Sequence, residues 1–115
     1  MGAWGIKAWE NDEAADWFGA FMEKVDTNFI LEEAERMLKT SDDFDGIRAI
    51  AYVLGHFGKV YIWPIEEIDR MKDVKGQVLA YLESMIKEDS EYMDMWDNDE
   101  GVKLELTKEI ELLRS

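Results

Sequence analysis

Four residues near the N-terminus could together carry acid–base chemistry. Asp12 and Asp16 are four positions apart, so a helix would place both carboxylates on one face, and Trp4 and Trp17 lie close by in the sequence. Two carboxylates that are buried to different extents can serve as an acid and a base. These residues therefore predict a small-ligand pocket lined by Trp4, Asp12, Asp16 and Trp17. The alternative is structural: Asn11 or Asp12 caps a helix, and Trp4 and Trp9 dock onto it.

A second candidate is the acidic segment 88–100, which holds seven acidic residues and no Lys or Arg. Carboxylates steer a basic partner toward a surface, and Tyr and Trp often anchor interfaces. The predicted partner-binding residues are Glu88, Asp89, Glu91, Tyr92, Asp94 and Trp96. The alternative is a solvated turn whose Trp96 is folded into the core.

Other catalytic motifs are missing from the sequence. His56 is the only histidine, and near a helix end it can bind the last carbonyls. No serine stands in a nucleophile elbow, and no glycine-rich phosphate loop occurs. Residues 41–46 imitate the start of a calcium loop, but Tyr52 stands where that loop needs Glu. We therefore predict no catalytic residue, no metal and no cofactor.

Charge narrows the range of partners. The chain has 115 residues, with 13 Lys and Arg against 27 Asp and Glu, which gives a net charge of −14. This argues against nucleic acid and anionic membranes as partners and permits a basic protein. Plain solubility is the alternative explanation. No cysteine, signal peptide or long apolar run is present, which predicts a cytoplasmic protein.

Apolar residues recur at helical spacing along most of the chain and predict an all-α bundle of five to seven helices. We expect one helical domain over residues 1–115, with an extended N-terminal segment docked on the core. Breaks are expected at 26–28 and 40–43, and helix starts at Pro64, Asp73, Ser90 and Asn98 or Asp99. Residues 59–63 have strand-like composition and are predicted to be an extended connector.

Two short motifs resemble a known family. The chain opens Met-Gly-Ala-Trp-Gly, and residues 11–17 read Asn-Asp-Glu-Ala-Ala-Asp-Trp. At this distance from the first Met, the pair resembles the bacterial family called domain of unknown function 4259. The resemblance implies a helical, cytoplasmic, bacterial protein and no assigned activity. Members of that family commonly carry an acidic residue in an Ala-rich helix, where this chain has Ala51-Tyr52-Val53.

Three hypotheses for function follow from these observations. The first is a non-catalytic protein-interaction module, similar in size and charge to immunity proteins that neutralise a basic toxin. The second is an enzyme or small-ligand-binding protein that uses the N-terminal carboxylates. The third is a subunit of a homo-oligomeric assembly in which exposed Trp and Met side chains become buried. The sequence leaves the oligomeric state open.

Overall fold

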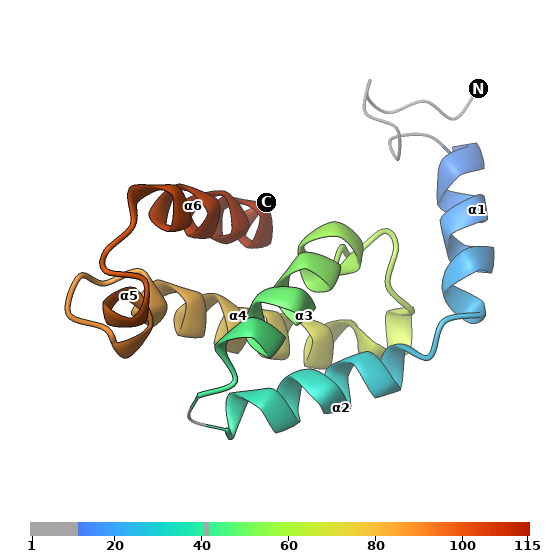
Figure 1. Cartoon of the computed structure of the whole chain (residues 1–115). Helices are drawn as coiled ribbons and strands as arrows, with labels where there is room; N and C mark the ends of the chain where they lie inside the picture. The colour runs from blue at the N-terminus through green and yellow to red at the C-terminus, as the bar shows by residue number, and fades with distance from the viewer. Residues whose placement is uncertain (1–11, 41) are drawn as a thin grey trace.

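The computed structural model describes residues 12–40 and 42–115, and within these ranges the chain is all-α, as predicted. Its elements are α1 (Asp12–Glu23), α2 (Thr27–Leu38), α3 (Phe44–Phe57), the 3₁₀ turn η1 (Ile65–Glu67), α4 (Ile68–Met85), α5 (Glu91–Met95) and α6 (Glu100–Arg114) (Figure 1). The predicted docking of the extended N-terminal segment, including Trp4, lies outside the described residues. No helix within them combines the length and apolar character needed to cross a membrane.

Side-chain caps explain where four of the helices begin. Asp26, Asp43, Ser90 and Asp99 each accept a hydrogen bond from the backbone N–H three residues later, at 2.9, 3.2, 3.0 and 3.0 Å respectively. Such a bond satisfies one of the unpaired N–H groups of the first helical turn. The breaks and starts predicted at these four positions are confirmed.

Two predictions about the middle of the chain are wrong. The long helix begins at Ile68 instead of Asp73, because η1 runs directly into α4 after Pro64. Residues 59–63 form a turn and are not extended: the N–H groups of Ile62 and Trp63 both donate to the Lys59 carbonyl, at 3.0 and 2.8 Å. Ile62 and Trp63 are buried, so the strand-like composition reflects burial of large side chains.

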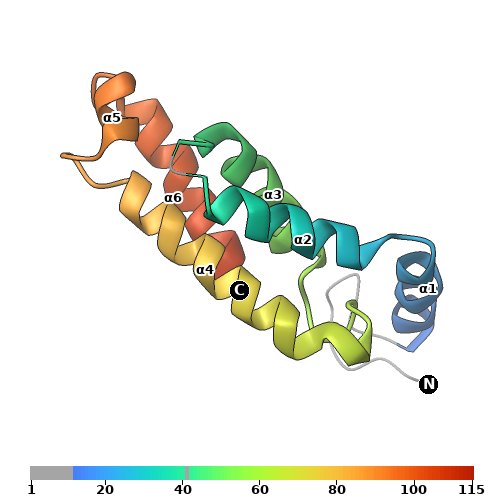
Figure 2. The ribbon, with the colours of Figure 1, turned by 90° about the horizontal axis from the view of Figure 1, so that it is seen from below.

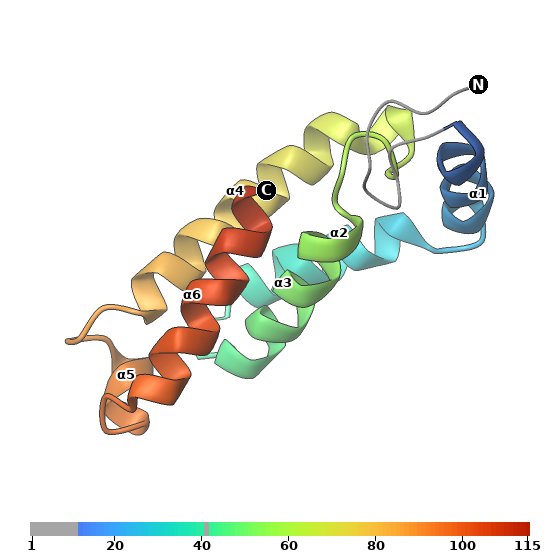
Figure 3. The same ribbon diagram turned by 90° about the horizontal axis from the view of Figure 1, so that it is seen from above.

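Helices α3 and α4 form the centre of the bundle. Helix α3 packs against α2, α4 and α6, and α4 also packs against α2 and α6 (Figures 2 and 3). Gly55 allows a close approach of α3 to α6, since a Cβ there would lie 2.6 Å from the Leu112 side chain. The inward face of α4 is formed by Val74, Val78, Leu82 and Met85, which are all buried.

Helices α1 and α5 lie at opposite ends of the molecule (Figures 1 and 2). On α1, Met22 is buried and Phe18 is partly buried against the core, whereas Trp17 and Phe21 are exposed. The Phe21 ring lies 6.0 Å from that of Phe57 on α3. The apolar stripe of α1 is therefore only partly covered by the described residues.

Candidate functional site

A hollow of about 320 Å³ opens between the start of α3 and α5, at the end of the molecule opposite α1 (Figure 1). We call it the acidic hollow, and it is lined by Asp42, Phe44, Asp45, Tyr92, Met95 and Trp96. A neighbouring hollow of about 220 Å³ shares Phe44 and Tyr92 and extends toward Tyr81. Aromatic walls with a few polar groups at the rim are typical of ligand-binding surfaces.

The α3 side of the hollow is set by the cap at Asp43. Its carboxylate accepts from the Gly46 N–H and starts the helix there, so Phe44 and Asp45 occupy the first turn of α3. Asp45 is exposed and favoured at this position by the positive end of the helix dipole. Asp42 precedes the cap and is also exposed, so two carboxylates border one partly buried ring.

The α5 side depends on a tight turn after Trp96. Asp97 and Asn98 both have left-handed backbone conformations, with φ of 51° and 54°, which Asp and Asn tolerate better than most residues. The Asn98 N–H donates to the Met93 carbonyl at 2.8 Å and closes the end of α5. As a result Met93 points into the core, while Met95 and Trp96 stay 65% and 47% exposed.

Tilted aromatic rings form the floor of the hollow. The ring centroids of Phe44 and Tyr92 are 5.2 Å apart with an interplanar angle of 55°. In the neighbouring hollow, Tyr81 lies 6.4 Å from Phe44 at an angle of 56°. Such tilted contacts suit the charge distribution of aromatic rings. Because Tyr92 is almost fully buried, this floor is fixed in place.

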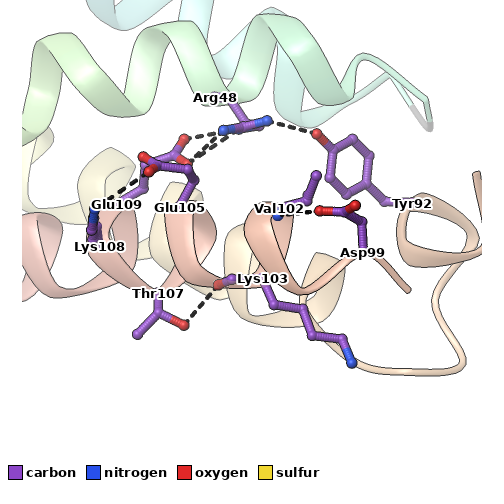
Figure 4. Close-up of polar contacts among 9 residues, drawn as sticks. All are labelled: Arg48, Tyr92, Asp99, Val102, Lys103, Glu105, Thr107, Lys108 and Glu109. Atoms are coloured by element: carbon purple, nitrogen blue, oxygen red, sulfur yellow. Dashed lines mark hydrogen bonds and ion pairs between the residues drawn. The ribbon is translucent and has the colours of Figure 1, made fainter. Parts of the chain in front are cut away.

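Arg48 braces the floor from behind (Figure 4). Its guanidinium donates to both carboxylate oxygens of Glu109, at 3.0 and 2.9 Å, and to the Tyr92 hydroxyl at 2.8 Å. The side chains of Arg48 and Glu109 are only 27% and 16% exposed. The hydrogen bond to Glu109 raises the pKa of Arg48, burial opposes this, and Tyr92 adds to the rise. One side chain of α3 thus fixes both α6 and α5.

The electrostatic field beside the acidic hollow, at Tyr81 of the neighbouring hollow, is negative. Burial raises the pKa of Tyr81, and the charges of Asp42, Asp43 and Glu91 raise it further. Carboxylates near the starts of α3 and α5 therefore all contribute to the negative potential at the Tyr81 hydroxyl. Arg48 does not cancel them, because its own charge is matched by Glu109.

The structure separates the predicted partner-binding residues into two groups. Glu88, Asp89, Glu91 and Asp94 are exposed, and Trp96 is half-exposed and not folded into the core. Tyr92 is 1% exposed, so it supports the hollow and does not present its ring to solvent. Glu88 lies 3.9 Å from Lys103 of α6, which partly offsets its charge.

Sequence reasoning missed the α3 side of the site. Asp42 and Asp45 were considered only as part of a calcium loop, and Phe44 and Met95 were not considered as site residues. The only available signal was a second group of acids beside an aromatic residue. Nothing in a single sequence shows that this group meets a segment about fifty residues later.

The N-terminal candidates remain a prediction, because one of the four, Trp4, lies outside the described residues. Asp12 and Asp16 are exposed on α1, and Trp17 is 60% exposed, with its ring stacked 5.2 Å from that of Phe21. Across residues 12–40 and 42–115, no three His, Asp or Glu side chains are grouped so that they could hold a metal ion.

Comparison with known proteins gives one result. A family model described as "Domain of unknown function (DUF4259)" matches residues 2–55. The chain resembles DUF4259. This confirms the resemblance predicted from the N-terminal motifs. No curated protein and no solved structure matches the chain.

The acidic hollow is built from two parts of the chain, and only one of them matches DUF4259. The matched segment, residues 2–55, contributes Asp42, Phe44, Asp45 and the bracing Arg48. The remaining lining residues and Glu109 lie beyond the matched segment. The site therefore depends on how α5 and α6 pack against the part that matches DUF4259.

Proposed function

We propose that this protein is a non-catalytic interaction module, immunity-like in size and charge, whose acidic hollow receives a basic side chain of a partner protein. The observation that carries this proposal is the placement of exposed Met95 and Trp96 on one hollow with the carboxylates of Asp42 and Asp45. No acid–base pair, nucleophile or cofactor is needed for this role.

The hollow matches the two parts of an arginine or lysine side chain. The aliphatic stem can pack on Met95 and Trp96, while the charged head meets Asp42 and Asp45. A guanidinium over the face of a tryptophan gains a cation–π interaction of roughly 0.5–2 kcal/mol, depending on how dry the contact is. Arginine is therefore the better fit, because its flat head can stack and pair with a carboxylate at once.

The rest of the protein favours association with a basic partner. A net charge of −14 attracts cationic proteins over long distances and raises the association rate at low salt. Glu91 and Asp94 are exposed on α5, so the negative field extends beyond the hollow. The Arg48 brace keeps the binding surface in shape before the partner arrives, which reduces the entropy lost on binding.

The proposal can be tested with a short arginine-rich peptide and isothermal titration calorimetry at low salt. The double variant Asp42→Asn/Asp45→Asn is expected to weaken binding about tenfold, since two exposed carboxylates each contribute modestly. The matched control is Glu66→Gln/Asp69→Asn, which removes the same charge from exposed positions in η1 and in the first turn of α4, far along the chain from α5. If the two double variants weaken binding equally, the peptide responds only to net charge and the proposal fails.

A partner from the host would extend this test. A pull-down at low salt with the wild-type chain and with Trp96→Ala should recover a basic protein with the first bait only. Recovery of no basic protein counts against the interaction role. Light scattering at high protein concentration tests the rival: an oligomer that dissociates in Trp96→Ala would instead assign Trp96 to self-association.

A further inference from the structure

A second cavity, of about 160 Å³, lies where the turn after α3 meets α4 and the end of α6. Three lysines line it: Lys59 from the turn, and Lys72 and Lys75 from α4. Tyr61 and Ser115 line the same cavity. This concentration of positive charge is unexpected in a chain with twice as many acidic as basic residues.

Two of the lysines are held in place by hydrogen bonds. The Lys75 ammonium donates to the Gly58 carbonyl at 2.8 Å, and the Lys59 ammonium donates to the Ser115 hydroxyl at 3.1 Å. Lys75 is half-buried, whereas Lys72 is exposed at the mouth. Within the part of the chain that the structure describes, neither Lys72 nor Lys75 forms an ion pair with a carboxylate.

The charge of Lys75 is offset by the Gly58 carbonyl at the end of α3 and, within the described residues, by no carboxylate. Burial lowers the pKa of Lys75 to about 8, and repulsion from Lys59 contributes to the shift. A negatively charged ligand in the cavity would relieve both costs, because it would pair with the buried ammonium and screen the repulsion between the lysines.

We propose that this lysine cavity, formed by Lys59, Lys72 and Lys75, binds a phosphate group. Three lysines that line one cavity suit an anion with several charged oxygens better than a single carboxylate. The volume equals that of about five water molecules, so the cavity is large enough for a phosphate group. The remainder of a phosphate ester would extend past Lys72 into solvent. This site is separate from the acidic hollow and does not depend on the function proposed for it.

Lysine reactivity gives a direct test on the intact chain. The protein is treated with an amine-acetylating reagent at neutral pH, with inorganic phosphate or with sodium chloride at the same ionic strength, and each lysine is quantified by mass spectrometry. Phosphate is expected to slow the acetylation of Lys75 several-fold, because it shields the amine and favours its protonated form. Lys108, which is 61% exposed on α6, should be acetylated equally in both salts.

A variant at the mouth separates the three-lysine site from a general salt effect. Lys72→Gln removes an exposed charge without disturbing the core and should raise the phosphate concentration needed for half-protection of Lys75 about threefold. Lys108→Gln is the matched control and should leave that concentration unchanged. Equal acetylation of Lys75 in phosphate and chloride would overturn the proposal, and so would equal protection in Lys72→Gln and the wild type.

A parallel series with glycerol phosphate identifies the source of the phosphate group. Protection at lower concentrations than inorganic phosphate would assign the cavity to a phosphate ester. Protection by inorganic phosphate alone would assign it to the free ion. Either result supports the phosphate site. Protection by neither compound would contradict it.

Discussion

The two ends of α3 carry opposite charges. At its N-terminus, Asp45 and the neighbouring Asp42 border the acidic hollow. Just beyond its C-terminus, Lys59 and Lys75 border the lysine cavity, and the Lys75 ammonium binds the carbonyl of Gly58, the C-cap residue. This arrangement follows the helix dipole, which favours anions at the N-terminus and cations at the C-terminus. The net charge of −14 therefore does not show that the two ends of α3 favour ligands of opposite charge.

The two ends also differ in what fixes them. The acidic end has a floor of packed rings, which Arg48 braces through Glu109 and Tyr92. The lysine end is held by a turn and by hydrogen bonds from flexible side chains. We therefore expect substitution of Arg48 at the acidic end to change stability strongly, and substitutions at the lysine end to change mainly charge and pH dependence.

The largest effect is expected for Arg48→Met. It leaves the mostly buried carboxylate of Glu109 without its partner, which typically costs about 3 kcal/mol of unfolding free energy. Urea denaturation measures this loss. The control is Arg114→Met, which removes the exposed pair with Glu83 and should cost no more than about 0.5 kcal/mol. Similar losses in the two variants would show that the brace is no stronger than a surface pair.

Trp96→Ala should separate binding from stability at the acidic end. The side chain is half-exposed, so its removal should change the unfolding free energy by less than about 1 kcal/mol. Truncating an aromatic anchor in an interface costs about 2 kcal/mol or more, so arginine-peptide binding should weaken at least tenfold by calorimetry. Acetylation of Lys75 and its protection by phosphate should stay as in the wild type. A change at both sites would mean that the two ends are coupled.

Tyr92→Phe distinguishes the ring from the hydroxyl. The ring stays packed against Phe44, but the hydrogen bond from Arg48 is lost, for an expected cost of about 1 kcal/mol in urea denaturation. Because the floor remains, peptide affinity should fall less than in Trp96→Ala. An affinity loss as large as that of Trp96→Ala would mean that the brace, and not the aromatic wall, determines binding.

The sequence predicted the parts of this comparison that depend on local rules. A break at 40–43 and helix starts at Ser90 and at Asn98 or Asp99 follow from the sequence, because short polar side chains satisfy backbone groups a few residues away. The acid and aromatic content of residues 88–100 was recognised, but the pairing of that segment with Asp42 and Phe44 required the fold.

The lysine cavity was missed for a related reason. Lys59 lies in a segment predicted to be extended, and Lys72 lies before the helix start predicted at Asp73. The actual turn and the earlier start of α4 bring Lys59 to the same wall as Lys72 and Lys75. An error of a few residues in an element boundary was enough to hide the site.

The smallest and most specific effect concerns the pH dependence of stability at the lysine end. The folded state lowers the pKa of Lys75 from 10.5 to about 8, so between these values the unfolded chain binds the extra proton. The free-energy cost of holding this charge in the fold is therefore complete below pH 8 and is relieved as the pH rises toward 10.5.

In Lys75→Met this cost of holding a charge is absent. The stability of the wild type minus that of the variant should accordingly rise across this window, by about 1 kcal/mol after allowance for solvent screening at a half-buried group. Urea denaturation at a series of pH values measures this difference. With phosphate present the rise should become smaller, because a bound anion returns the pKa toward its usual value. A rise of the same size with and without phosphate would still support the cost of burying the Lys75 charge. It would contradict the proposal that phosphate binds in the lysine cavity.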